Sequence, residues 1–196
     1  MADETEFAIG ARASCIDGLC GKVSRIIVDP ATDTVTHLVI EPKHRLGPAR
    51  FVPVNLVDAT DGDIRLRCTL AEFDQLDPAE EIEPVQGAPM GLGPGGMMAP
   101  TGIPAPVMTV VSETVPVGET DVSPGEHVHA LDGEIGRVQG FLVDPGDHRV
   151  THVVLQEGHL WGRKEVAIPV SAVTGMENGI RLNLTKKQVE DLPPVD

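Results

Sequence analysis

One segment of the chain occurs twice, and this repeat constrains the fold more than any other feature of the sequence. Residues 17–23 match residues 132–138 at a shift of 115, and the same shift carries residues 28–30 onto 143–145 and 35–40 onto 150–155. After one inserted residue, 64–66 match 180–182. A collinear series of this length indicates a duplicated module of about 70 residues, a size at which small domains can fold.

Each copy has the pattern of several short strands and one closing helix. Asp17-Gly18 and Asp132-Gly133 are typical of tight hairpin turns, and residues 35–40 and 150–155 are nearly continuous apolar strands. Near the end of each copy, Thr69 with Glu72 and Thr185 with Gln188 form capping-box patterns. We therefore expect a mainly β fold with two small antiparallel barrels, each closed by a short C-terminal helix.

The two copies are separated by a segment of different composition. From Gly87 to Pro106 the sequence is dense in Gly, Pro and Met, which disfavours both helices and strand ladders. Its Met residues could in principle bind copper(I), but no Cys or His lies nearby, so we favour a disordered tether. The expected organisation is module 1 at 7–78, a flexible linker at 79–120 and module 2 at 121–195.

The order of motifs resembles a known family. Asp-Gly, Gly-[Lys/Arg]-Val, Val-Asp-Pro, Val-Thr-His and a closing Leu-x-Leu before the helix follow one another as in the PRC-barrel domain, and they do so twice. The family is similar to the cytoplasmic domain of the photosynthetic reaction-centre H subunit and to the C-terminal domain of the ribosome maturation factor RimM. This resemblance implies a binding module without catalytic residues. It does not imply that this chain has the specific role of the H subunit or of RimM.

Composition excludes some partners. The formal net charge is −15, with 30 acidic against 15 basic residues, so binding to nucleic acid or to an anionic membrane surface is not expected. The sequence has no apolar run of the length that a membrane helix needs, and its acidic start lacks the features of a signal peptide. We expect a cytoplasmic location.

The three cysteines do not indicate a metal site. Cys15, Cys20 and Cys68 lack zinc-binding spacing. A two-residue turn at Asp17-Gly18 would place Cys15 opposite Cys20, which leaves a disulfide conceivable, but in a reducing cytoplasm we favour two small apolar side chains.

Histidines are the other candidates for chemistry. His37 and His152 occupy equivalent positions, and we favour a structural role in which a ring nitrogen bonds a neighbouring backbone group. His127 and His129 should share one face of a strand, and with His148 and His159 they could form a metal site, although spacing alone is weak evidence. We expect no cofactor and no catalytic residue.

A variable loop in each module is the predicted contact surface. Trp and Arg are enriched at interface hot spots. The two loops also carry positive charge on an acidic chain, and Lys43 and Arg50, which flank the first loop, add to this charge. The alternative is that Trp161 packs against its own protein. The candidate partner-binding residues are His44, Arg45, Leu46, His159, Leu160, Trp161, Arg163 and Lys164.

The sequence therefore predicts a non-catalytic adaptor that binds a protein partner. We expect its modules to pair with each other or with a second chain. The alternatives are a protein that binds metal or a small molecule through the histidines of module 2, and a ribosome assembly factor similar to RimM.

Overall fold

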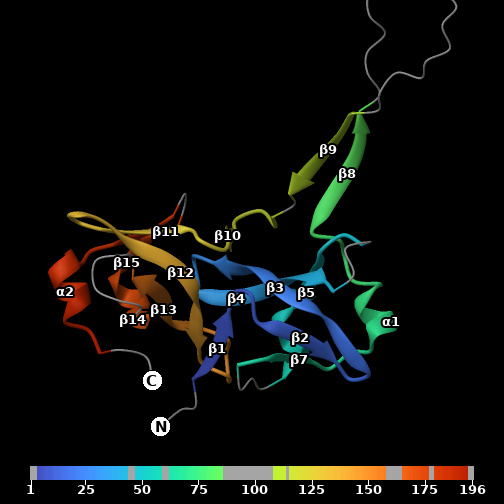
Figure 1. Cartoon of the computed structure of the whole chain (residues 1–196), viewed down its shortest axis with the longest axis horizontal. Helices are drawn as coiled ribbons and strands as arrows, with labels where there is room; N and C mark the ends of the chain where they lie inside the picture. Colours follow the sequence, from blue (N-terminus) through green and yellow to red (C-terminus); the bar gives the residue numbers. More distant parts are fainter. Residues whose placement is uncertain are drawn as a thin grey trace, which may run out of the picture. The chain divides into compact units, whose positions relative to one another are not determined.

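A computed structural model describes residues 4–43, 47–58, 62–85, 108–113, 115–157, 165–176 and 179–193. It contains two compact units. One comprises residues 1–79 and 115–196 and holds both modules, and the other comprises residues 80–114. The mainly β fold expected from the sequence is confirmed (Figure 1).

Module 1 forms one curled sheet. The hydrogen-bonded order of its strands is β5-β4-β3-β2-β7-β6, an open path within the described residues. A 3₁₀ turn, Val54–Leu56, joins β5 to β6. The elements are β2 (Arg12–Cys15), β3 (Gly18–Asp29), β4 (Thr34–Pro42), β5 (Arg50–Pro53), β6 (Val57–Asp58), β7 (Ile64–Leu66) and helix α1 (Leu70–Phe73).

Module 2 repeats this path strand for strand. Its order is β14-β13-β12-β11-β16-β15, and a 3₁₀ turn at Val170–Ala172 occupies the same place as in module 1. The elements are β11 (His127–Ala130), β12 (Gly133–Val143), β13 (Val150–Glu157), β14 (Glu165–Pro169), β15 (Val173–Gly175), β16 (Ile180–Leu182) and helix α2 (Lys186–Glu190). Both predicted capping boxes are formed.

Each sheet gains its seventh strand from the segment that precedes the other module. β1 (Thr5–Ala8) leads into module 1 but pairs antiparallel with β12 of module 2. β10 (Thr120–Val122) leads into module 2 but pairs antiparallel with β3 of module 1. The sequence boundaries at 7 and 121 both fall within these exchanged strands.

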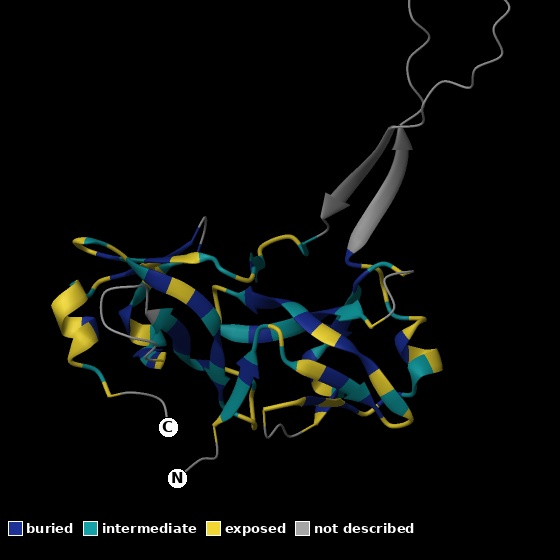
Figure 2. Ribbon diagram, in the orientation of Figure 1, coloured by how far each residue is buried: buried dark blue, intermediate teal, exposed yellow. Residues whose placement is uncertain are grey.

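The exchange gives the two modules a common hydrophobic core. Phe7, on β1, and Val122, on β10, are 2% and 0% exposed, and both belong to one cluster that includes residues of both sheets. Figure 2 shows the buried positions running through the strands of both modules. A second, smaller cluster of Ile27, Val39, Ala49 and Ala79 covers the other face of β4, as the continuous apolar pattern of that strand predicted.

The second unit contains a hairpin. β8 (Glu80–Val85) pairs antiparallel with β9 (Met108–Glu113), with Ile82 opposite Val111. The hairpin lies inside the range predicted as linker, and the Gly/Pro/Met segment at 87–106 lies outside the described residues.

Candidate functional site

The predicted contact residues lie outside the part of the chain that the structure describes. His44, Arg45 and Leu46 fall between β4 and β5, and His159, Leu160, Trp161, Arg163 and Lys164 fall between β13 and β14. These are equivalent connections in the two modules, as the repeat predicted.

Arg50 has a local structural contact. Its Nη1 donates a hydrogen bond to the carbonyl oxygen of Leu76 at 2.9 Å, and residues 77–79 continue alongside β5 through the amide of Phe51, which donates to the carbonyl of Asp77 at 2.9 Å. Its guanidinium therefore fastens the segment after α1 to the edge of the sheet.

The structure reveals a different pair of exposed side chains. Ile16 is at the tip of the β2–β3 hairpin and Leu131 at the tip of the β11–β12 hairpin, with 72% and 70% of their surfaces exposed. The repeat shift of 115 relates the two positions. We call Ile16 and Leu131 the two tip residues.

Each tip is held by the short helix at the end of its module. The carboxylate of Asp17 accepts a hydrogen bond from the amide of Leu70 at 2.8 Å, and that of Asp132 accepts one from the amide of Lys186 at 2.8 Å. Both amides belong to the first residue of a helix, where no intrahelical acceptor exists. The tips are thus fixed in place while their aliphatic side chains face solvent.

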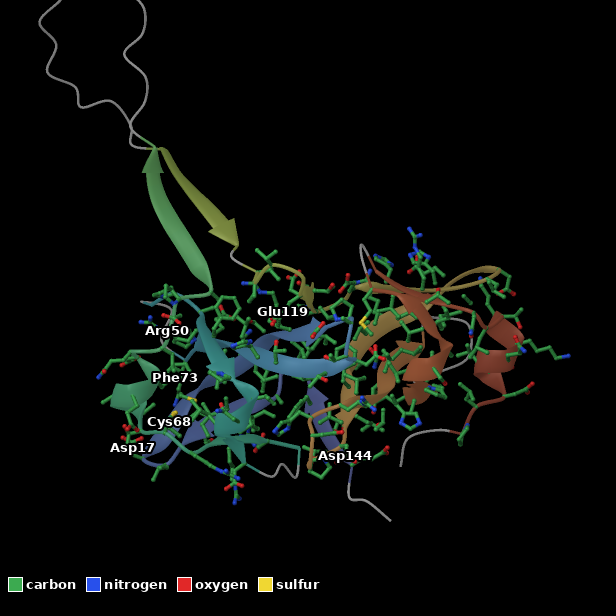
Figure 3. All side chains as sticks on the ribbon, turned by 180° about the vertical axis from the view of Figure 1, so that it is seen from behind. Asp17, Arg50, Cys68, Phe73, Glu119 and Asp144 are labelled. Atoms are coloured by element: carbon green, nitrogen blue, oxygen red, sulfur yellow. The ribbon has the colours of Figure 1, made fainter. Side chains whose placement is uncertain are left out.

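The helices in turn are fixed by their capping boxes. The hydroxyl of Thr69 accepts from the amide of Glu72 at 3.3 Å, and the Glu72 carboxylate accepts from the Thr69 amide at 2.8 Å. These bonds hold the pKa of Glu72 below its ordinary value. Figure 3 shows Asp17, Cys68 and Phe73 together at the α1 end of module 1, and Figure 1 shows α1 and α2 at opposite ends of the two-module unit.

The tip residues were missed because the predicted turn was wrong by one residue. Cys15 pairs with Gly18, so the two-residue turn is Ile16-Asp17 and not Asp17-Gly18. Cys20 is the unpaired residue of a bulge in β3, and it is not opposite Cys15. The Asp17 bond to the helix selects this register, and the recurrence of an aliphatic residue before Asp-Gly in both copies was the available signal.

The three cysteines form a buried cluster beneath the first tip. Their thiols are free, with the Sγ atoms of Cys15 and Cys68 4.0 Å apart and the Sγ of Cys20 donating to the Ala13 carbonyl at 3.1 Å. Burial raises the pKa of each thiol above its ordinary value. Protonated thiols of this kind are poor nucleophiles at neutral pH.

The histidines of module 2 are not brought together. The rings of His127 and His129 lie 6.3 Å apart on one side of β11, and the Nδ1 of His127 is 2.5 Å from Glu134, whose pKa this contact lowers. His148 lines a cavity elsewhere, and His159 lies outside the described residues. Within the described ranges, no group of three or more His, Cys, Asp or Glu residues is placed to hold a metal ion.

His37 and His152 face carboxylates from the exchanged segments. The Nδ1 of His37 is 3.8 Å from Glu119, and the Nδ1 of His152 is 3.5 Å from Glu4. His37 Nδ1 makes no hydrogen bond to any described residue, and His152 Nδ1 is 3.1 Å from the hydroxyl of Thr151. Strand exchange therefore brings a carboxylate close to Nδ1 of each ring, and the expected bond from a ring nitrogen to the backbone stays a prediction.

A cavity of about 390 Å³ lies where the exchanged strand β1 meets both modules. Phe7, Val57 and Val143 supply apolar walls, and the Asp58–Arg67 ion pair, with an N–O distance of 3.2 Å, supplies polar groups. Its remaining lining residues are Thr5, Asn55, Pro145 and His148. Its lining is therefore more polar than that of a typical small-molecule site, which is mostly apolar.

Comparison with protein families identifies the second module. The family model of the PRC-barrel domain matches residues 130–189, which span β12 to α2, so the family recognition made from the sequence is confirmed. Module 1 repeats the strand order of that matched region. No curated protein matches the chain. Among the described residues, no helix is long and apolar enough to cross a membrane.

Proposed function

We propose that the protein is a non-catalytic, cytoplasmic adaptor of tandem PRC-barrel modules that binds a protein partner through its two tip residues. The observation that carries the proposal is the equivalent exposure of Ile16 and Leu131, at 72% and 70%. Exposed aliphatic side chains on a fixed backbone lose little entropy on binding, which favours a contact role.

Two equivalent tips suit a partner with two equivalent sites. α1 and α2 lie at opposite ends of the two-module unit (Figure 1), and each tip is hydrogen-bonded to one of them. Engaging both tips raises the apparent affinity beyond that of either contact alone. The loops that contain Arg45 and Trp161 are a second proposed part of this surface. Closure of each barrel by its helix also stays a prediction, supported by the burial of Phe73 on α1 and Val189 on α2.

The test is an affinity capture with the full chain and three variants. I16S/L131S removes both tips, W161A tests the loop, and V117S is the control because Val117 is fully exposed but belongs to neither tip hairpin, β2–β3 or β11–β12. We expect a partner that is retained by wild type and V117S and lost by I16S/L131S, with circular dichroism showing the variant folded. Equal retention by I16S/L131S and wild type would exclude the tips as the contact surface.

The cavity of about 390 Å³ supports a second candidate function, the binding of a small molecule. Of the described histidines in the predicted metal set, His148 alone lines it, and His127 and His129 do not. Mass spectrometry of the protein purified under native conditions would detect a retained ligand, and loss of that ligand in R67A would place it in the cavity.

A further inference from the structure

The two exchanged strands are placed identically. Phe7 pairs with Phe141 and Val122 pairs with Ile26, and the repeat shift of 115 converts the first pair into the second. The neighbouring pairs, Thr5 with Val143 and Thr120 with Val28, obey the same relation. Each module therefore accepts a strand at the equivalent position, on β3 or β12, and donates the equivalent strand, β1 or β10, to the other module. We call these positions on β3 and β12 the acceptor edges.

The chain leaves each acceptor edge in the same way. The amide of Ala11 donates to the carbonyl of Ala8 at 3.2 Å, and the amide of Glu126 donates to that of Ser123 at 3.2 Å. Gly10 and Gly125 make these turns possible, because their φ angles of +90° and +77° are strained for other residues. After the turn, the chain joins its own module.

A third contact lies between the modules. The amide of Val35 donates to the carbonyl of His148 at 3.0 Å, and the amide of Val150 donates to that of Asp33 at 2.7 Å. Thr34 and Arg149, which the shift also relates, form the bridge between these bonds. The two modules thus associate with the reciprocal contacts of a twofold homodimer.

We propose that this interface also binds a second copy of the chain, by exchange of whole modules. In the resulting dimer, module 1 of one copy pairs with module 2 of the other, and the reverse pairing completes it. All contacts of the two-module unit are kept, and only residues 80–114, which include the β8–β9 hairpin, take a different path, so no new surface has to be complementary. The inference does not depend on the proposed adaptor function.

Residue 140 favours one of the possible pairings. Ala8 lies opposite Gly140, and a Cβ at this position would be 2.3 Å from the carbonyl oxygen of Phe7. The equivalent residue of β3 is Arg25, so β3 can accept a strand over three residues, as it accepts β10, but without the fourth pair that Ala8 makes with Gly140. Two copies of module 1 would lose this pair, which favours a closed dimer with two lobes, each containing one module 1 and one module 2.

Concentration determines how much dimer forms. A covalent connection between two modules gives an effective concentration of about 1 mM, which favours the single chain in dilute solution. The dimeric fraction should therefore increase about a hundredfold when refolding is carried out at ~100 µM instead of ~1 µM. High salt should increase it further, because each copy has a net charge of −15.

The experiment uses the full chain with a protease site inserted between Gly96 and Met97. Unlabelled and ¹⁵N-labelled chains are unfolded together, refolded at both concentrations and separated by size-exclusion chromatography with light scattering. The dimer is then cleaved and measured by native mass spectrometry. We expect it to fall apart into two lobes of monomer mass, about half of them with one light and one heavy module.

The control is a mixture of light and heavy monomers that were refolded and cleaved separately, in which mixed lobes should not appear. Three outcomes would each overturn the proposal: monomer alone at both concentrations, a dimer that keeps its mass after cleavage, or lobes that are wholly light or wholly heavy. Because the tip residues take no part in this measurement, its failure would leave the adaptor proposal to be judged by its own test.

Discussion

Modules 1 and 2 follow the same strand order, but they accept the exchanged strand differently. β1 pairs with β12 over four residues, and the ladder continues through the amide of Ile9, which donates to the carbonyl of Gln139 at 2.7 Å. β10 pairs with β3 over three residues. The difference arises at two positions. Gly140 in β12 is replaced by Arg25 in β3, and only glycine allows the backbones to approach so closely. Ile9 is replaced by Pro124, which has no amide hydrogen to donate.

Module 1 has a charged contact at the position where module 2 has close backbone approach. Arg25 is 8% exposed, and its Nη1 lies 3.7 Å from the carboxylate of Asp121 on β10. The residue equivalent to Asp121 is Glu6 on β1, which lies near another acid, Glu165. The comparison teaches that a duplicated interface can keep its register while its two halves are stabilised by different interactions.

The largest expected effect on the free energy of unfolding comes from the buried residues of the exchanged strands, Phe7 and Val122. Phe7→Ala should lower the free energy of unfolding by about 3–5 kcal/mol, because a fully buried ring is removed from the shared core. Val122→Ala, the equivalent change on β10, should cost about 2 kcal/mol, since it removes less buried volume. Urea titration followed by circular dichroism measures both, and equal losses would contradict the view that β1 is the more strongly anchored strand.

The next effect tests the acceptor position. Gly140→Ala should cost about 2 kcal/mol, because the new methyl group would meet the backbone of Phe7 and Ala8. The matched control is Gly175→Ala, where a Cβ meets no atom within 4 Å and a change of less than about 0.5 kcal/mol is expected. Hydrogen exchange at β1 should increase in Gly140→Ala alone, and unchanged protection there would contradict the role given to Gly140.

The smallest effects distinguish the two equivalent acids. Asp121→Asn should lower the free energy of unfolding by about 1 kcal/mol, because it weakens the contact to the buried Arg25. Glu6→Gln should raise it by about 0.5 kcal/mol at neutral pH, because burial first, and then Glu165, raise the pKa of Glu6 above its ordinary value of 4.5.

The sign of the Glu6 effect follows from linkage. A carboxyl group with a raised pKa in the folded state favours folding while it is protonated, and this contribution is lost as the pH rises through that pKa. Glu6→Gln should therefore match wild type below about pH 4 and exceed it above that range. Thermal unfolding from pH 3.5 to 7.5 checks this, and a constant difference at every pH would show that charge is not its cause.

Local patterns predicted much of the fold. The repeat, the turns and the capping boxes all depend on residues close together in sequence, and Thr69 with Glu72 forms the expected cap. The predicted turn at Asp17-Gly18 was wrong by one residue, because the Asp17 carboxylate accepts a hydrogen bond from the amide of Leu70, 53 residues away. The recurrence of an aliphatic residue before Asp-Gly was the one local signal for the tip residues, and the predicted contact loops remain a prediction.

The sequence by itself determined the module, its duplication and its hydrophobic alternation, because these features follow from residue spacing and local backbone preference. Only the tertiary structure decided which module each flanking strand joins. β1 and β10 both lie next to their own modules in sequence. No local pattern shows whether such a strand will pair with the sheet of its own module or with that of the other module. That choice depends on backbone approach at Gly140 and on burial of Phe7 and Val122 in one core, which exist only once both modules are folded together.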